Sequence, residues 1–401
     1  MTHTSLHGTK PRVLKFRKPT NRVNLIVHGQ GVIAFNATAP CYLTFCDASG
    51  NPGLYVQFTK TGIFVNAMPS DEPLIDRQNS RGISDEDGAY YWFSLDSQNL
   101  RLYGGIGEAR VENLLYQFKS PDISSREAVK KFFESLVSVR TDNLQITALL
   151  RDPISSQRVP LLVKDSDEIT MDAIAAGTIM PKANLSMTSQ KLYDAISGKR
   201  FALNTADFPN FTRAIERSIA TPGLWCYERL KAKASEFDKD KPNEKETYLR
   251  ITLGENNGES PGIPYVMEIW PVGHFSPVHN HGGSTAIIRV LHGAIEVSLF
   301  PFLGDSVAPF AVANFAKGDI TWISPTLNQV HQLKNPDTNK ATCITIQCYM
   351  YEGDDKTHYD YFDYLDGGGA TQQFEPDSDM GFGEFKETMK AEWGARSCWG
   401  I

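Results

Sequence analysis

The chain has 401 residues, of which 41% are hydrophobic, 22% charged and 11% aromatic, a composition and length typical of a globular protein with two domains. Its net charge of −7 gives no electrostatic reason to bind nucleic acid or an anionic membrane, and no apolar run approaches the roughly 18 residues of a membrane-spanning helix. We therefore expect a cytoplasmic protein, with neither nucleic acid nor a membrane as partner. The residues before Asp47 include several bases and no acid, which leaves organelle targeting as an alternative.

Residues 1–120 contain many short aromatic or β-branched segments separated by turn residues, which predicts a β-sandwich or a small barrel. The segment YYWFSLDSQNLRLYGGIGEARVENLLYQF (Tyr90–Phe118) loosely resembles the β-sandwich module found beside farnesoic-acid-methyltransferase-type sequences. No titratable cluster appears in this part of the chain. We therefore predict an accessory domain that binds an unknown ligand or protein. The expected strands are 23–27, 31–36, 42–46, 54–58, 62–66, 90–94 and 100–103.

Residues 121–185 read as a linker region with one helix. That helix is expected at 126–139, with Ser124 or Ser125 as its cap and apolar residues on one face. The C-terminal domain is expected at 186–401 and begins with a helical segment. Helical periodicity places its helices at 187–196, 208–219 and 224–237.

The histidines of the second half point to a metal site. Alternate residues of a strand face the same side, so His279 and His281 in the segment HNH present two imidazoles to one point. The surrounding glycines fit the first cupin motif, and a second run from Gly318 to His331 fits the second cupin motif. This pattern predicts a metal held by His279, His281 and His331, whereas His274 and His292 are expected either to be structural or to hold the metal ligands in position. The second motif's usual glycine is replaced by Asn328, which also tolerates a positive φ.

The donor set favours one kind of metal. Ala286 stands where cupins normally carry a glutamate ligand, so the site has three neutral imidazoles. A divalent ion there keeps its full charge and about three open positions, which suits a bidentate substrate and dioxygen. The sequence therefore predicts Fe(II) as the cofactor, rather than a hydrolytic or purely structural metal.

The C-terminal half resembles the cysteine dioxygenase family of thiol dioxygenases. The similarity lies in YVMEIWPVGHFSPVHNHGGSTAIIRVLHGAIEVSLF (Tyr265–Phe300), in AIERSIATPGLWCYERLKAKAS (Ala214–Ser235) and in TYLRITLGE (Thr247–Glu255). The resemblance implies a cupin fold, a double-stranded β-helix or jelly-roll barrel with a helical preface. With the N-terminal sandwich, the expected fold class is mainly β in two domains.

The same resemblance implies roles for single residues. Arg250 would bind a substrate carboxylate, for which its planar fork is suited, and Tyr349 would donate a hydrogen bond near the oxygens. Gln347 stands where the family has a histidine, and it cannot change its charge. Ala286 also stands where animal members carry the cysteine that cross-links to the tyrosine. Two further residues, expected in the core, could line the substrate pocket: Tyr248 and Trp270.

These observations lead to one function and to alternatives. We expect an Fe(II)-dependent thiol dioxygenase that uses O2 to oxidise a small carboxylate-bearing thiol, cysteine or a close analogue, to its sulfinic acid. A second possibility is another three-histidine cupin enzyme, such as a lyase or a diketone-type dioxygenase. A third is a non-catalytic metal-binding sensor, in which Gln347 marks lost catalysis.

Overall fold

The structure is a computed structural model that describes residues 13–16, 18, 20–37, 40–68, 82–83, 90–119, 126–142, 144–254, 264–351 and 361–395. More of these residues lie in β-strands than in helices, as expected for a mainly β fold. The chain divides into two compact units, an N-terminal unit Met1–Arg158 and a C-terminal unit Val159–Ile401. Of the helices in the described part of the chain, none has the length and apolar character needed to cross a membrane.

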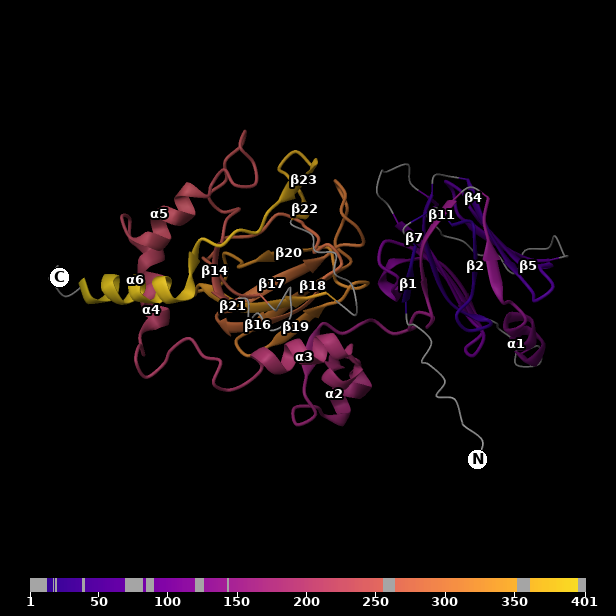
Figure 1. The fold of residues 1–401 in the computed structure, drawn as a ribbon, viewed down its shortest axis with the longest axis horizontal. Coiled ribbons are helices and arrows are strands. Elements are labelled where there is room, and N and C mark those ends of the chain that lie inside the picture. The colour runs from indigo at the N-terminus through magenta and orange to yellow at the C-terminus, as the bar shows by residue number, and fades with distance from the viewer. Residues whose placement is uncertain are drawn as a thin grey trace, which may run out of the picture. The chain divides into compact units, whose positions relative to one another are not determined.

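The N-terminal unit contains two antiparallel sheets (Figure 1). The strand order is β1-β11-β3-β7-β8-β9 in the larger sheet and β2-β10-β4-β5-β6 in the smaller. The strands are β1 (Val13–Lys15), β2 (Arg22–Asn24), β3 (Gln30–Ala37), β4 (Cys41–Cys46), β5 (Pro52–Phe58), β6 (Ile63–Ala67), β7 (Tyr90–Asp96), β8 (Arg101–Ile106), β9 (Leu114–Lys119), β10 (Ser138–Arg140) and β11 (Leu144–Leu150). The helices are α1 (Arg126–Glu134) and the 3-10 turn η1 (Val111–Asn113).

Aromatic side chains join the two sheets of the N-terminal unit. Phe35 of β3 meets Phe58 of β5 with ring centroids 4.9 Å apart, and Phe45 of β4 meets Phe93 of β7 at 5.7 Å. Each pair has one ring from each sheet, and all four residues are fully buried. Edge-to-face and tilted contacts of this kind stabilise an apolar core beyond the area that they bury. The sheets therefore face each other as in a sandwich, the architecture expected from the short alternating strands.

The N-terminal unit extends past the expected boundary at residue 120. β10 lies between β2 and β4, and β11 lies between β1 and β3, so both sheets need strands from the segment read as a linker. For the same reason α1 ends at Glu134 rather than at residue 139. Leu136 and Val139, which continue the helical apolar pattern, are buried as part of the sandwich instead. The expected cap, Ser124 or Ser125, lies outside the described residues.

The C-terminal unit contains the remaining strands and helices. Its strands are β12 (Leu162–Lys164), β13 (Ile179–Pro181), β14 (Leu249–Gly254), β15 (Tyr265–Trp270), β16 (Thr285–His292), β17 (Ala294–Leu299), β18 (Ala311–Ala316), β19 (Ile320–Ile323), β20 (His331–Lys334), β21 (Cys343–Met350), β22 (Phe362–Leu365), β23 (Thr371–Phe374) and β24 (Met380–Gly381). Its helices are α2 (Met171–Ala176), α3 (Met187–Ile196), α4 (Phe211–Ala220), α5 (Trp225–Ala232), α6 (Phe382–Ala395) and the 3-10 turn η2 (Lys182–Asn184).

One large sheet organises the C-terminal unit. Its order is β13-β12-β19-β16-β21-β15-β14-β24, and smaller sheets are formed by β18-β17-β20 and by β22-β23. Because β12 pairs with β19 through Val163 and Ile320, the unit begins at Val159 and not at the expected residue 186. α3 packs on β16 and β21, and α4, α5 and α6 lie together beside β14 (Figure 1).

The alternation of residues along β21 explains how this sheet positions a site. Ile344 and Ile346 belong to the apolar cluster under the helices, whereas Thr345 and Gln347 point to the opposite face. Both faces are covered, so nearly the whole strand is buried, as is usual for a central strand with two covered faces. Polar residues on the inner face therefore lie in a buried setting.

The helices agree in part with the periodicity. α3 occupies the expected 187–196, and the hydroxyl of Ser186 accepts a hydrogen bond from the Ser189 amide as its cap. α4 starts at Phe211, not at 208, because Phe208 closes a turn with Thr205. α5 ends at Ala232, five residues before the expected end.

Candidate metal centre

Three histidines converge in the C-terminal unit. His279 follows β15 along the chain and forms a pair of backbone hydrogen bonds with His331, the first residue of β20, at 3.0 Å in each direction. His281 lies two residues further along. One ring nitrogen from each of these histidines lies within 4.8 Å of the others. The structure thus brings together the three residues in which the sequence analysis placed the metal.

The hydrogen bonds around two of these rings fix their tautomers. His279 Nδ1 lies 3.0 Å from the carbonyl oxygen of Pro277, and His331 Nδ1 lies 3.1 Å from that of Asn328. A carbonyl only accepts, so each Nδ1 carries the hydrogen and each Nε2 presents a lone pair. Asn328 has a φ of 64°, the left-handed conformation expected from its place in the motif.

The third ring shows that the cluster fits a cation. His281 Nε2 lies 3.2 Å from His331 Nε2, and His281 Nδ1 is buried with no hydrogen-bond partner among the described residues. Two ring nitrogens at this distance need either a shared proton or a cation between them. Three Nε2 or Nδ1 donors meeting in this way match the imidazole sets that bind transition metals.

Burial keeps the rings neutral. Desolvation lowers the pKa of His279 to about 4 and that of His331 to about 3, and it lowers the pKa of His281 well below its usual value. At neutral pH all three imidazoles are therefore neutral, with one N–H and one free lone pair each, which is the form that ligates metal.

The other predicted site residues line the same pocket as the histidines. Arg250, Gln347 and Tyr349 project into it, and so do Tyr248 and Trp270, whose rings stack with centroids 4.2 Å apart. The two aromatic residues are thus both core residues and pocket walls. Every residue that the sequence analysis named for metal or substrate lies in this one pocket.

Tyr349 is the polar residue next to the histidines. Its ring stacks on that of His281 with centroids 5.6 Å apart, and its hydroxyl donates to Gln347 Oε1. Burial raises the pKa of Tyr349, so the phenol stays protonated and remains a donor. Ala286 pairs with Tyr349 across the strands and presents only a methyl group, so no thiol is available opposite the phenol.

Arg250 is held inside the pocket by a residue that the sequence analysis missed. Its Nη1 lies 3.3 Å from Oε1 of Glu268, the residue opposite it on β15, and Gln347 Nε2 donates to the second oxygen of Glu268. Glu268 is 4% exposed. A single acid inside the apolar segment YVMEIW was the signal that could have revealed it, since a buried carboxylate needs such partners.

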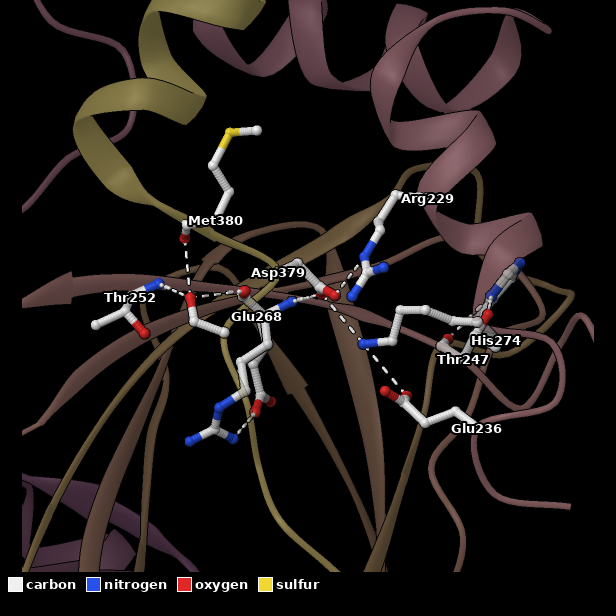
Figure 2. A network of polar contacts seen from close by, with 11 residues as sticks. Arg229, Glu236, Thr247, Thr252, Glu268, His274, Asp379 and Met380 are labelled. Atoms are coloured by element: carbon white, nitrogen blue, oxygen red, sulfur yellow. Dashed lines mark hydrogen bonds and ion pairs between the residues drawn. The ribbon is translucent and has the colours of Figure 1, made fainter. Parts of the chain in front are cut away.

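A second missed residue, Asp379, ties the C-terminal segment to the Arg250 strand. It accepts hydrogen bonds from Arg229 Nε at 2.8 Å, from Lys233 Nζ at 3.1 Å and from the Arg250 amide at 2.7 Å. Figure 2 shows Asp379 at the centre of this network, and Glu236 also pairs with Lys233, at 3.2 Å. Three other pocket residues that were missed come from the hairpin β22–β23: Phe362, Tyr364 and Phe374.

The remaining histidines of this region lie outside the cluster. His274 Nδ1 contacts the side chain and the carbonyl oxygen of Thr247, at 3.1 and 3.0 Å (Figure 2). His292 Nε2 lies 3.2 Å from Glu216. Both therefore have structural contacts, in agreement with the sequence analysis.

Comparison with known proteins gives fold likenesses only. No family model matches the chain. The cupin domain of Cnp3 from Schizosaccharomyces pombe is 15% identical, with a TM-score of 0.21 over 26% of this chain and 65% of that one. L-ribose isomerase from Cellulomonas parahominis is 15% identical, with a TM-score of 0.22 over 26% and 61%. The cupin domain of an XRE family transcriptional regulator from Enterobacter cloacae is 12% identical, with a TM-score of 0.21 over 26% and 98%.

In the first two of these comparisons the chain covers less than two thirds of the other protein's length. TM-scores near 0.2 mean that the likenesses carry no argument for the activity, substrate or metal of this chain. What the site can do chemically follows from its own residues: a neutral three-nitrogen donor set, a guanidinium and a phenol in one buried pocket.

Proposed function

We propose that the C-terminal unit is a cupin-type, Fe(II)-dependent thiol dioxygenase that oxidises a small carboxylate-bearing thiol, cysteine or a close analogue, to its sulfinic acid. The observation that carries this proposal is the presence of three neutral histidines and one guanidinium in a single buried pocket. The overall reaction is RSH + O2 → RSO2H. Both oxygen atoms are added to sulfur, which loses the four electrons that O2 gains, so no further reductant is required.

The donor set supports the choice of metal class. His279, His281 and His331 would hold the ion, and iron bound by them would supply redox chemistry with dioxygen. Because the three ligands are uncharged, the cation's charge would be left for anionic groups of the substrate. The carbonyl oxygens of Pro277 and Asn328 orient two of the rings before any metal arrives.

The chain's own residues would bind and orient the thiol. Arg250 offers a planar donor fork to a carboxylate, and Tyr349, protonated by virtue of its burial, offers a hydrogen bond beside the histidines. Tyr248, Trp270 and Phe237 form an aromatic wall that limits the access of water. The pocket thus contains one group for each polar part of such a substrate.

A non-catalytic metal-binding sensor is the second candidate, and one observation favours it. Arg250 and Gln347 already contact Glu268, so the groups that would handle substrate have partners within the protein. Another three-histidine cupin enzyme, a lyase or a diketone-type dioxygenase, would use the same ligands.

Oxygen consumption distinguishes these functions. The full chain would be loaded with Fe(II) under anaerobic conditions and then mixed with O2 and one thiol from a panel of cysteine, 3-mercaptopropionate, cysteamine and larger thiols. We expect O2 uptake and an equal amount of sulfinate with a carboxylate-bearing thiol. Uptake without sulfinate would favour another cupin enzyme, and metal binding without uptake on any thiol would favour the sensor.

Arg250→Ala tests the substrate class. It should weaken the binding of carboxylate thiols at least about tenfold and change the binding of cysteamine little, since a charge-assisted pair is worth about 1.5 kcal/mol or more. Equal losses for both kinds of thiol would mean that the arginine is structural.

For the N-terminal unit we propose an accessory binding role. Tyr42 and Tyr55 stack with centroids 5.4 Å apart on the outer face of its smaller sheet, where both are partly exposed. Paired aromatic rings on an open sheet face suit contact with a ligand or another protein.

A further inference from the structure

The pocket contains an ion pair made by the protein alone. Arg250 on β14 and Glu268 on β15 are directly paired in the sheet register, and their side chains are 11% and 5% exposed. The distance from Arg250 Nη1 to Glu268 Oε1 is 3.3 Å. The guanidinium that a substrate carboxylate would need is therefore already next to a carboxylate.

A chain of hydrogen bonds holds Glu268 in this position. Tyr349 donates to Gln347 Oε1, and Gln347 Nε2 donates to Glu268 Oε2. Each oxygen of Glu268 thus has a donor, one from Arg250 and one from Gln347. The chain begins beside His281, on which the Tyr349 ring stacks, so it connects the histidine cluster to the ion pair.

The charges around Glu268 come from three elements. Arg250 lies on β14 and Tyr248 directly before it, Tyr349 and Cys343 lie on β21, and Lys233 lies directly after α5. Burial raises the pKa values of Tyr248, Cys343 and Tyr349, so these groups are neutral near pH 7.

The positive charge of Lys233 is already compensated, because Lys233 forms ion pairs with Asp379 and Glu236. Arg250 and Glu268 therefore cancel each other. A second carboxylate at Arg250 would lie close to the first, and like charges in a dry site disfavour each other strongly.

We infer that Glu268 determines the specificity of this pocket, and that a ligand carboxylate binds at Arg250 only as Glu268 takes up one proton from solvent. The proton converts Glu268 to a neutral acid, and the guanidinium then pairs with the ligand. A thiol without a carboxylate needs no such proton. The inference rests on the proposed function only for the class of ligand, a small carboxylate.

The proton is available near neutral pH. Burial raises the pKa of Glu268 to about 7, against the opposing effect of Arg250. Below that pH the acid is already neutral in the empty pocket, and above it each ligand must bring a proton. The affinity for carboxylates should therefore fall about tenfold per pH unit above pH 7.

Calorimetry on the metal-free full chain tests the inference without any oxidation chemistry. Propionate would be titrated at pH 6.0, 7.0 and 8.5, in two buffers of different ionisation enthalpy, so that the protons taken up are counted. We expect close to one proton per propionate at pH 8.5 and few at pH 6.0. His279 and His331 do not contribute in this range, since burial lowers the pKa of each to about 4 and 3.

Glu268→Gln provides the matched variant. It should bind propionate with nearly constant affinity across the range and at least about tenfold more tightly than the wild type at pH 8.5. Glu268→Met serves if the first variant fails to fold, and Glu236→Gln, which removes a partly buried acid outside the pocket, should keep the wild-type pH slope.

Three results would overturn the inference: no proton uptake by the wild type, an unchanged pH slope in both Glu268 variants, or no propionate binding to any form. Its failure is distinct from that of the proposed function. Proton-linked propionate binding without thiol oxidation would remove only the proposed function. Thiol oxidation with a pH-independent KM for carboxylate thiols would remove only the inference.

Discussion

Asp379→Ala should destabilise the C-terminal unit strongly. The carboxylate is 2% exposed and has three partners, of which Lys233 is 5% exposed and Arg229 is 43% exposed. Removing it leaves a buried ammonium with Glu236 as its remaining acid, and it leaves the Arg250 amide without an acceptor. Breaking a buried ion pair typically costs 3–5 kcal/mol. Because the half-exposed Arg229 can be solvated by water and Lys233 keeps Glu236 as a partner, we expect a loss of unfolding free energy at the lower end of this range, about 3 kcal/mol.

Urea unfolding followed by tryptophan fluorescence measures this loss, since Trp225, Trp270 and Trp322 lie in the C-terminal unit. Asp379→Asn keeps an acceptor for the Arg250 amide and should lose about half as much. Asp207→Ala is the matched control, because Asp207 also contacts two lysines but is 58% exposed, and it should leave the midpoint unchanged. Equal midpoints for the wild type and Asp379→Ala would refute the reasoning.

Three further predictions concern the C-terminal unit, two of them its metal centre. His281→Ala should reduce the bound metal, measured by elemental analysis, from about one ion per chain to almost none. The control His292→Ala, outside the cluster, should bind as much metal as the wild type. Full metal occupancy in His281→Ala would contradict the assignment. The metal-free protein should lose stability against urea as the pH falls from about 6.5 towards 4. Histidines of the unfolded chain take up protons in this range, whereas the buried imidazoles of the folded chain do not, since the pKa of His331, for example, is lowered to about 3. Burial also raises the pKa values of Glu268, Glu236 and Glu246, which acts in the opposite direction and offsets part of this loss. A midpoint that rises on acidification would refute the histidine argument. Gly293→Ala should lower the free energy of unfolding by at least about 2 kcal/mol in the same assay, because the φ of Gly293 is +69° and the added Cβ would lie 2.5 Å from the Thr342 carbonyl oxygen. An unchanged urea midpoint would contradict this prediction.

Local pattern was a good guide to the strands and a poor one to the domain boundary. The alternation of β4 and β5 is visible in the residues themselves, and so is the capped helix α3. The place of β10 in the smaller sheet is not visible, because its pairing partners lie in strands β2 and β4, about a hundred residues earlier. Leu136 then reads as one more position of a helix, although it belongs to the sandwich.

The same distinction holds at the site. His279 and His281 are two residues apart, and spacing alone puts them on one side of a strand. Glu268 lies near Arg250 only because β14 and β15 pair in one register, and a register shift of a single residue would separate them. Asp379 reaches the Arg250 amide from 129 positions away, a contact that no local pattern contains.

The order in which the pocket acquires its parts follows from where those parts lie in the chain. The three clustered histidines and Arg250 have all been synthesised by residue 331. The hairpin β22–β23, which completes the pocket wall, and Asp379, which contacts the Arg250 amide, come later. A chain cut after residue 351 would keep the three histidines in its sequence. It would lose the pocket residues of β22–β23, the strand β24 that pairs with β14, and the core residues Phe385 and Met389 of α6. Because none of the three histidines lies in the lost segment, metal content alone would not report whether the pocket is complete.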